Sequence, residues 1–400
     1  MVSISAPHPP STPPSLSQAD PSYPLSHLYH RVRRDTDTDT NTNTNADPDT
    51  NPMKLPIVPS LMLGGLPLGF VPSNYGASSM SQLNTLLGPA AGKAATYGWY
   101  AQTYPDQPFN GNQLLWQMND IVQSGAILEA AVMPVGGWAG LTAQDNSRAV
   151  EICNVMKRFT DSGVEVRLRF GHEVNWYVQE GRYEGGADQG VGAYKEAFAT
   201  VAKACRAAAP KVKMWYSPSW ADLATYDRYA PDLQYVDLVG LDFYPDKLAN
   251  ANVEFFISQF KPFHDKYTSG GRIKFAIGET GLHLDANLDA HLAWLQMVCS
   301  NEVRRALPNL LSVTYFNVMQ TAEQNDYRIL QLDGNATTPA NAQTLGVLRD
   351  AKRRTSLAAP RGLPKGSASD AKRQYVVRLS LHALLGLEAL LGLALASHWL

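Results

Sequence analysis

Short apolar runs alternate with longer amphipathic stretches from about Leu66 to Arg349. The runs are rich in Val, Ile, Leu and aromatic residues, which is typical of strands buried on both faces. They are PLGFV (67–71), ATYGWYA (95–101), AILEAAVMPV (126–135), VEVRLRFG (164–171), VKMWYS (212–217), VDLVGLDFY (236–244), IKFAIG (273–278) and LLSVTYFNV (310–318). The pattern therefore predicts a series of buried parallel strands.

Between these runs the apolar residues repeat with the spacing of a helix. The first such stripe precedes Gly125, which is suited to end the helix as a left-handed cap. The stripes are Leu114, Leu115, Met118, Ile121 and Val122; Ile152, Val155, Met156 and Phe159; Tyr194, Ala197, Phe198 and Val201; and Leu288, Leu292, Leu295 and Cys299. Strand and helix are thus expected to alternate.

Eight strands with helices between them, over roughly 250 residues or more, predict an α/β protein with a (β/α)8 TIM barrel. A doubly wound open sheet is the alternative, but it normally carries a glycine-rich phosphate turn after its first strand. Here the first strand runs into Pro72-Ser73-Asn74-Tyr75. We predict a single barrel domain over residues 64–352.

The segments on either side differ from the barrel in composition. Residues 1–63 are dominated by Pro, Ser, Thr, Asp and Asn, and we expect a disordered tail because such a segment buries little apolar surface. No basic region followed by an apolar one begins at Met1, whereas Met53-Lys54 precedes a short apolar stretch. A start at Met53 is therefore an alternative to a start at Met1.

The last residues form a linker (353–376) and a hydrophobic segment (377–400), which His382 and Glu388 interrupt. The small residues 366–369, a polar spacer and the apolar end together are similar to a glycolipid-anchor signal. Membrane contact through residues 379–400 is one expectation. An amphipathic helix that packs on the barrel or on a membrane is the other.

Composition narrows the classes of function. Lys plus Arg (34) nearly balances Asp plus Glu (36), which argues against a nucleic-acid partner. No Cys/His pattern indicates a metal site, and we expect no metal and no cofactor. The cysteines at 153, 205 and 299 continue or adjoin helical apolar stripes, so core packing is expected; a Cys153–Cys205 bridge is the alternative.

Polar and aromatic residues gather where the predicted strands end, and a (β/α)8 barrel carries its active site at the C-terminal ends of its strands. They are Arg169, His172, Glu173, Asn175, Trp176 and Tyr177 on the fourth strand, Asp242 and Tyr244 on the sixth, Glu279 on the seventh, and Tyr315 and Asn317 on the eighth. Two carboxylates, Glu173 and Glu279, are thereby expected to face each other across the barrel mouth.

Such a pair of carboxyl groups suits glycoside hydrolysis, in which one protonates the departing oxygen and the other attacks the anomeric carbon or activates water. The apolar and aromatic neighbours of Glu173 suit a proton donor, whose pKa must be raised. Glu279 must stay ionised, and Tyr244 and a bidentate Arg169 could donate hydrogen bonds to it.

Each residue also has a structural interpretation. A glutamate that ends a strand can be a solvated rim residue or a helix cap, and His172 can be a core histidine. Trp176 and Tyr177 can pack a loop, and Arg169 can pair with Glu165 or Asp242. Other reactions find less support: Trp176 occupies the second histidine position of an HExxH motif, and no GxSxG motif is present.

Five segments, in order along the chain, resemble the glycoside hydrolases of family 26. They are R-x-x-H-E-x-N-x-Y (169–177), W-x-S-P-S (215–219), Tyr229-Ala230-Pro231, the run from Tyr235 to Tyr244, and Gly-Glu-Thr-Gly (278–281). The likeness extends over roughly Gly69 to Val347. It is closest to fungal members through Tyr97-Gly98-Trp99-Tyr100-Ala101-Gln102 and Phe275-Ala276-Ile277-Gly278.

The resemblance implies a retaining β-glycanase on a (β/α)8 barrel. Glu173 would be the acid/base and Glu279 the nucleophile, with carboxyl groups about 5–5.5 Å apart. His172 would orient the pair, Tyr244 would hydrogen-bond the nucleophile, and Arg169 and Asn317 would support the site.

Two departures from mannan-degrading members fall where the central sugar should stack. Their Gly-x-Trp after the acid/base is compressed here to Asn175-Trp176-Tyr177, and their eighth-strand Trp is Tyr315, beside Phe316. Mannan specificity therefore does not follow from the resemblance.

Aromatic faces bury the C–H surfaces of sugars while nearby polar groups bind hydroxyls. Trp215 and Tyr216 are adjacent in one strand, so only one of them can point inward. The substrate-binding candidates are Trp99, Trp138, Asn175, Trp176, Tyr177, Trp215, Trp220, Asp242 and Tyr315. Their spread over several strand ends predicts an extended cleft for a polysaccharide.

We therefore expect a monomeric, retaining endo-β-glycanase that hydrolyses a neutral cell-wall polysaccharide: mannan, xylan or β-glucan. The sequon Asn335-Ala336-Thr337 favours a secreted or cell-surface protein. One alternative is a barrel that binds glycan without catalysis. Another is a wall-anchored transglycosylase that remodels the β-glucan of its own cell.

Overall fold

The computed structural model of the protein describes residues 60–72, 80–283, 286–320 and 325–358. The chain divides into two units, Met1–Arg353 and Arg354–Leu400, and the fold below is that of the first. Residues 1–59 of the predicted tail and the predicted hydrophobic segment lie outside the described residues. Of the predicted linker, only the residues up to 358, which end the last helix, are described. Within the described residues, no helix is long and apolar enough to cross a membrane.

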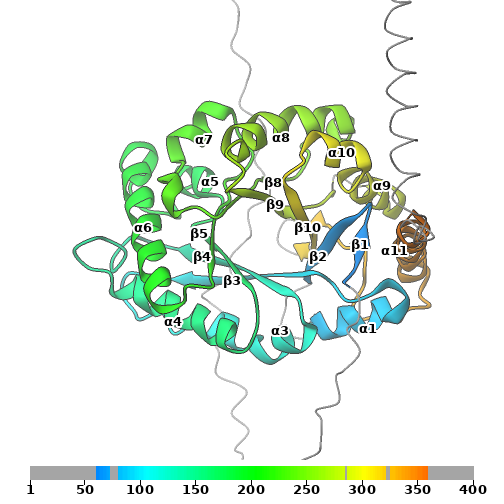
Figure 1. Cartoon of the computed structure of the whole chain (residues 1–400), viewed down its shortest axis with the longest axis horizontal. Coiled ribbons are helices and arrows are strands. Elements are labelled where there is room, and N and C mark those ends of the chain that lie inside the picture. Colours follow the sequence, from blue (N-terminus) through cyan, green and yellow to red (C-terminus); the bar gives the residue numbers. More distant parts are fainter. Residues whose placement is uncertain (1–59, 73–79, 284–285, 321–324, 359–400) are drawn as a thin grey trace, which may run out of the picture. The chain divides into compact units, whose positions relative to one another are not determined.

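A closed parallel barrel forms the centre of this unit (Figure 1). Its strands are β2 (Leu66–Pro72), β3 (Thr96–Thr103), β4 (Ile127–Pro134), β5 (Val166–Phe170), β6 (Lys213–Tyr216), β7 (Leu238–Val239), β8 (Asp242–Phe243), β9 (Lys274–Thr280) and β10 (Leu310–Asn317). β2 pairs in parallel with both β10 and β3, which closes the sheet. The predicted (β/α)8 barrel is confirmed.

The predicted sixth strand is interrupted. β7 pairs with β6 and β9, and β8 pairs with β9 through Asp242 and Glu279. At the entrance, β1 (Met62–Leu63) pairs antiparallel with β2, and Leu61 and Leu63 are buried. Residues 60–63, which we placed in the tail, therefore belong to the fold.

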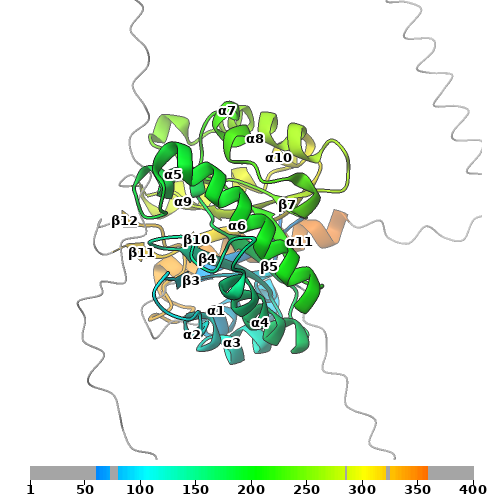
Figure 2. The same ribbon diagram turned by 90° about the vertical axis from the view of Figure 1, so that its left-hand side faces the viewer.

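Helices surround the barrel (Figures 1 and 2). They are α1 (Met80–Ala91), α2 (Asn112–Leu115), α3 (Met118–Ser124), α4 (Ser147–Asp161), α5 (Val174–Gln179), α6 (Gly186–Ala208), α7 (Leu223–Tyr229), α8 (Val253–Thr268), α9 (Leu288–Val298), α10 (Asn301–Ala306) and α11 (Pro339–Ala358), with 3-10 turns η1 (Leu233–Tyr235) and η2 (Leu248–Asn250) and short strands β11 (Met319–Gln320) and β12 (Asn325–Asp326). The first predicted stripe is divided between α2 and α3. Gly125, at φ 70°, forms the C-terminal cap of α3, as predicted.

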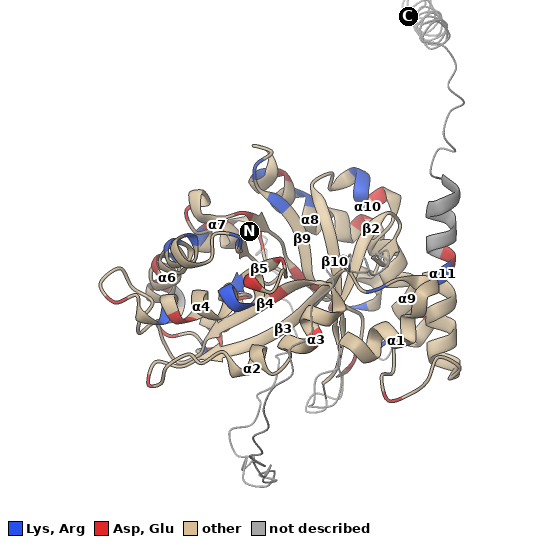
Figure 3. Ribbon diagram, turned by 60° about the horizontal axis from the view of Figure 1, so that its bottom comes forward, with Lys and Arg blue, Asp and Glu red and all other residues tan. Residues whose placement is uncertain are grey.

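Alternation along the strands separates an apolar outer face, packed against the helices, from an interior that holds both polar and aromatic side chains. Inside the barrel Glu129 pairs with Arg167 (3.2 Å) and accepts a hydrogen bond from Thr314 (2.6 Å). Arg167 also donates to Ser312 at 2.7 Å. A Cβ atom on Gly69 would lie 1.8 Å from the Thr96 hydroxyl, so this part of the barrel wall requires glycine. Charged residues of both signs are dispersed over the surrounding helices (Figure 3).

A disulfide between Cys153 and Cys205 joins α4 to α6. Our preferred interpretation, in which these two thiols only pack in the core, is therefore wrong, and the alternative is correct. Sequence spacing shows that two cysteines lie on neighbouring helices but not that their side chains point at each other. Cys299 is a free, buried cysteine, as expected.

Candidate active site

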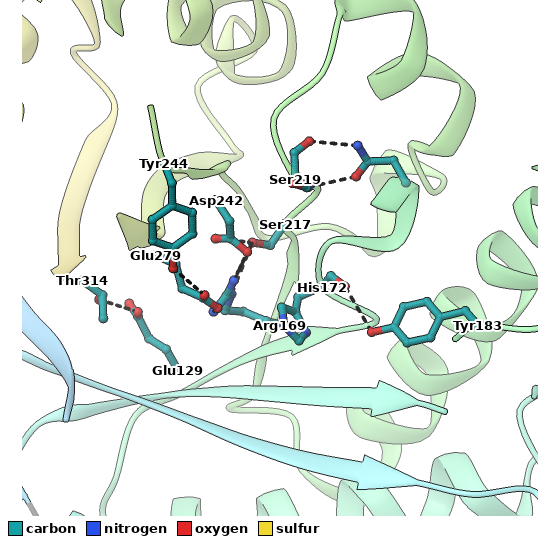
Figure 4. Close-up of polar contacts among 11 residues, drawn as sticks. Glu129, Arg169, His172, Tyr183, Ser217, Ser219, Asp242, Tyr244, Glu279 and Thr314 are labelled. Carbon is teal, nitrogen blue, oxygen red and sulfur yellow. Dashed lines mark hydrogen bonds and ion pairs between the residues drawn. The ribbon is translucent and has the colours of Figure 1, made fainter. Parts of the chain in front are cut away.

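Three strand ends bring Arg169 (β5), Asp242 (β8) and Glu279 (β9) together in the barrel mouth (Figure 4). Arg169 Nη1 donates to Glu279 Oε1 at 2.8 Å, and Nη2 pairs with Asp242 Oδ2. The guanidinium also donates to the Ser217 hydroxyl (3.2 Å) and lies over the Trp215 ring, 5.4 Å from its centroid. The single cation thus fixes the positions of two carboxylates.

This arrangement corrects one expectation and decides between two others. Arg169 is not bidentate to Glu279, because it divides its donors between Glu279 and Asp242. Of the two structural partners considered for Arg169, Asp242 is the one it contacts, while Glu165 pairs with Arg167 (3.3 Å). Burial lowers the pKa of Arg169, but the two carboxylates outweigh this effect and raise it well above its usual value. Arg169 therefore stays charged.

Gly278 allows Arg169 to approach β9. A Cβ atom at position 278 would lie 2.7 Å from the Arg169 guanidinium carbon. Any larger residue would displace the cation from the carboxylates. The Gly-Glu sequence thus has a steric reason: the glycine admits the cation that the glutamate needs.

Glu279 also accepts a hydrogen bond from Tyr244, whose hydroxyl lies 3.0 Å from Oε2, as expected. The carboxylate is only 2% exposed. Each of its oxygens has a donor, Arg169 for Oε1 and Tyr244 for Oε2, so the orientation of the carboxylate is fixed. These are the properties of a carboxylate that acts as a nucleophile.

Glu173 follows β5 and has a strained backbone. Its φ of 50° makes it the one non-glycine residue with positive φ among the described residues. Its N–H donates to the Ser217 carbonyl at 2.7 Å, which ties this turn to β6. Such conformations cost on the order of 1–3 kcal/mol and occur most often at functional sites.

The environment of the Glu173 carboxyl favours its protonated form. Burial, followed by the nearby charge of Glu279, raises its pKa from 4.5 to about 8, while Arg169 acts in the opposite direction. Glu173 thus holds its proton at neutral pH. The separation of about 5–5.5 Å between the two carboxyl groups stays a prediction.

Asp242 serves the site through Arg169 rather than through a free carboxylate. Its side chain is fully buried and also lies within hydrogen-bond distance of Ser217 (3.4 Å). Burial raises its pKa well above the usual range, although Arg169 opposes the shift. A direct contact between Asp242 and substrate, as we expected, has no support in these contacts.

Asn175 links two loops of the mouth. Its amide donates to the Ser219 carbonyl (3.0 Å) and accepts from the Ser219 N–H (2.9 Å). Both polar atoms of the amide are thereby occupied by the loop that follows β6. We assigned Asn175 to substrate binding, and the structure shows it instead as a residue that positions the loop after Glu173.

His172 is buried between aromatic rings, with centroids 5.7 Å from Tyr100 and 5.6 Å from Tyr177. Burial and the charge of Arg169 hold its pKa well below the usual value, so the ring is neutral. Neither ring nitrogen has a hydrogen-bond partner among the described residues. Any orienting effect of the His172 ring on the glutamates therefore acts through packing. The backbone carbonyl of His172 accepts a hydrogen bond from the Tyr183 hydroxyl (3.1 Å).

The aromatic residues on β3 and β6 divide between the two faces of the barrel. Trp99 points outward, since its Nε1 donates to the Gln113 carbonyl (2.9 Å), whereas Tyr100 points inward, toward His172. Trp215 points inward beneath Arg169 but has no exposed surface. Our assignment of Trp99 and Trp215 to substrate binding is therefore wrong, and Tyr100 was missed as a residue of the mouth.

The eighth strand shows the same one-residue shift. Tyr315 is fully buried on the outer face, edge-on to Phe70 and 3.4 Å from His291 Nδ1. The inward residue is Phe316, whose ring packs against Tyr244 (5.7 Å). Tyr315 is therefore wrongly assigned, since a shift of one position exchanges the faces of a strand.

The remaining candidates mostly pack loops. Trp138 donates to the Glu184 carbonyl (2.8 Å), and Trp220 donates to Gln259 (2.9 Å) and packs on Phe243. Asn317 contacts the backbone of residues 329 and 330 through both ends of its amide. Trp138 and Asn317 thus stabilise loops through hydrogen bonds to the backbone, and the indole N–H of Trp220 is occupied by Gln259.

Trp176 and Tyr177 lie beside the acid. Trp176 is half-buried, and Tyr177 is fully buried with a hydroxyl close enough to Glu173 to lower its pKa slightly. Trp176 therefore keeps part of its surface exposed, whereas Tyr177 has none. Within the described part of the chain, no group of three or more His, Cys, Asp and Glu side chains could hold a metal ion.

Comparisons with known proteins give fold-level likenesses. No family model matches the sequence, and no curated protein matches it. Among solved structures, a Bacillus endo-β-1,4-mannanase of glycoside hydrolase family 26 is 18% identical with TM-score 0.49, covering 73% of this chain and 86% of that one. A family 26 β-mannanase from Bacteroides ovatus is 15% identical with TM-score 0.49, covering 72% and 90%.

A fungal β-1,4-galactanase is 14% identical with TM-score 0.46, covering 70% of this chain and 94% of that one. The structural neighbours reported are thus glycoside hydrolases from both bacteria and fungi. They give no support for the predicted closeness to fungal members.

Proposed function

We propose that the protein is a retaining glycoside hydrolase that cleaves a neutral β-linked polysaccharide within the chain. The observation that carries this proposal is the unequal environment of two glutamates at the C-terminal ends of β5 and β9. Burial and Glu279 keep Glu173 protonated, while Arg169 and Tyr244 donate to Glu279. Environments that separate the protonation states of two carboxyl groups assign the acid and the nucleophile.

In the first step the Glu173 proton passes to the glycosidic oxygen as that oxygen leaves. A carboxylate oxygen of Glu279 bonds to the anomeric carbon on the opposite face, giving a glycosyl ester. Loss of the negative charge on Glu279 removes the repulsion that raised the pKa of Glu173. The ionised Glu173 is then a suitable base for the second step.

In the second step Glu173 takes a proton from water as the water oxygen attacks the anomeric carbon. The ester bond to Glu279 breaks, and the carboxylate returns to Arg169 and Tyr244. Two inversions give retention of configuration. No cofactor enters either step.

The proposal extends to substrate and location. Dispersed surface charge and the near balance of charged residues support a neutral glycan such as mannan, xylan or β-glucan. The Cys153–Cys205 disulfide and the exposed Asn335 of the sequon support a secreted or cell-surface protein, because disulfides persist in oxidising compartments.

The test is a reducing-sugar screen of the full chain on mannan, xylan, β-1,3-glucan and mixed-linkage glucan. Glu279→Gln should abolish the signal, and Glu254→Gln, a change of the same kind at an exposed position on α8, should not. NMR of the first product should show the anomeric configuration of the substrate. Activity that survives in Glu279→Gln, or none in the parent protein on any substrate, would overturn the proposal.

Glu173→Ala separates the acid from the nucleophile. It should retain activity on aryl glycosides with good leaving groups and gain rate with added azide, because azide needs no base. Parent-like activity of this variant on unactivated polysaccharide would remove Glu173 from the role of acid.

A further inference from the structure

A hollow of about 200 Å³ lies where β3 ends, outside the group of residues around Glu173 and Glu279. The residues that matter for its chemistry are Gln102, Tyr104, Gln107, Asn110, Asn112 and Trp116. The hollow is smaller than the roughly 300–1,000 Å³ of pockets for drug-sized ligands, which limits it to about one sugar unit.

Trp116 is the most exposed large apolar residue of the described structure, at 72%. Tyr104, at 38%, is a second exposed ring of the same hollow. Large exposed apolar side chains that line a concavity mark binding sites more often than isolated ones do. The two rings offer flat apolar surfaces to a ligand.

Amide side chains surround these rings, and none of the side chains that line the hollow is charged. Gln107, Asn110 and Asn112 are exposed, and each amide carries both donors and acceptors. A ligand with an apolar face and many hydroxyl groups satisfies both features. A phosphate or a sugar acid would find no counter-charge among these lining residues.

The loop that carries the hollow is held in place from α4. Arg148, which is 8% exposed, donates to the Thr103 hydroxyl (3.2 Å), to the Tyr104 carbonyl (2.6 Å) and to the Gln107 carbonyl. Glu151 accepts from the Phe109 N–H (2.8 Å). A binding loop that is already ordered loses less conformational entropy when a ligand binds.

Gln102 links the hollow to the inward face of β3, which also carries Tyr100 of the mouth. Gln102 lines the hollow and lies two positions after Tyr100 in β3, so both side chains are on the inward face. Gln113 holds Gln102 by accepting from its N–H (2.7 Å) and by an amide contact. A glycan chain that extends from the mouth along the inward face of β3 would run toward the hollow.

We propose that this hollow binds one neutral pyranose unit of the polysaccharide, with Trp116 as the stacking platform, as a subsite remote from the cleaved bond. The inference rests on the proposed function, because it assigns the bound unit to the same chain that Glu173 and Glu279 cleave. It predicts a preference for longer substrates.

The experiment measures binding without turnover. Full-length Glu279→Gln protein is titrated calorimetrically with manno-, xylo- and cello-oligosaccharides, from disaccharides to hexasaccharides. Trp116→Ala in this background should weaken hexasaccharide binding about tenfold or more, the usual scale for removal of a central aromatic contact. Trp116→Ala should leave disaccharide binding unchanged. The control is Leu233→Ala, which truncates an exposed apolar residue of η1 before β7 and should leave binding unchanged.

Unchanged hexasaccharide affinity in Trp116→Ala would overturn the inference and leave the proposed function standing. An equal loss for all lengths would also overturn it, because the hollow would then be no extension of the mouth. A parent protein that neither binds nor cleaves any of these sugars would overturn the proposed function as well.

Discussion

Arg169 and Asp242 form an ion pair in which neither side chain has any exposed surface. The same guanidinium holds Glu279, so the position of the nucleophile depends on a residue that lies inside the barrel. Removal of one partner from such a buried group leaves an uncompensated charge, which is strongly destabilising.

We expect Arg169→Lys to reduce kcat/KM on an aryl glycoside by about 100-fold, because an ammonium cannot bridge two carboxylates in the planar geometry of a guanidinium. Stability in urea unfolding should fall by less than the roughly 3–5 kcal/mol that removal of a buried charge costs, because lysine keeps the positive charge. Arg206→Lys, at an exposed position of α6, serves as the control and should change neither quantity. Parent-like kinetics in Arg169→Lys would show that the bridge does not position Glu279.

Activity should decline above a pH of about 8, because Glu173 must be protonated to act and its pKa is raised to about 8 by burial and by Glu279. The measurement is the pH profile of kcat/KM. An alkaline limb at a much lower pH would contradict the environment described for Glu173.

Stability should depend on the same group. The folded protein binds the Glu173 proton more tightly than the unfolded chain, so this contribution is full below a pH of about 4.5 and is lost as the pH rises to about 8. Glu173→Gln, which does not titrate, should flatten the free energy of unfolding over this window. An equal slope in parent and variant would assign the dependence to other groups.

The positive φ of Glu173 predicts a difference between two variants that both lack the carboxyl group. Glu173→Gly should be more stable than Glu173→Ala by about 1–2 kcal/mol, since only glycine adopts this conformation without strain. Urea unfolding of both proteins measures the difference. Equal stability, or a more stable alanine variant, would show that the turn after β5 relaxes.

The two faces of β10 can be tested with Phe316 and Tyr315. Phe316→Ala should lower kcat/KM about tenfold or more, because Phe316 packs against Tyr244, which holds Glu279. Tyr315→Phe should keep kcat/KM within about twofold, because the lost hydroxyl contacts His291 and the Leu282 backbone on the outer face of β10. The reverse result would restore Tyr315 as the residue of the mouth.

The disulfide should contribute stability without affecting the reaction. It closes a loop across a separation of 52 residues, for which the chain-entropy model gives about 4 kcal/mol. The double variant Cys153→Ala/Cys205→Ala should lose about 2–4 kcal/mol in urea and keep its kinetics. Parent-like stability of this variant, or free Cys153 and Cys205 thiols in the denatured native protein, would contradict the bond.

The sequence was sufficient for the barrel, because buried strands and amphipathic helices have distinct periodicities that do not depend on distant contacts. It was also sufficient to bring Glu173, Glu279, Arg169 and Tyr244 to one mouth, since strand ends of a (β/α)8 barrel converge.

The faces of individual strands could not be predicted in the same way. Trp99 against Tyr100, and Tyr315 against Phe316, are pairs of adjacent aromatic residues, so the pattern of apolar residues does not distinguish inward from outward. Thr96 and Thr314 could have indicated the correct faces. Both are small polar residues that point into the barrel, and residues two or four positions away on the same strand share that face. Trp116 was missed because it lies outside any strand.

The contacts between Arg169 and its two carboxylates also bear on how this group of residues could change in evolution. A glycan-binding descendant has no use for Glu279, but a single substitution there would leave Arg169 with less compensating charge inside the barrel. Such a lineage would meet a penalty in folding before it gained any advantage in binding. Arg169, Asp242 and Glu279 should therefore be replaced together rather than one at a time, because each depends on the others for a buried charge partner.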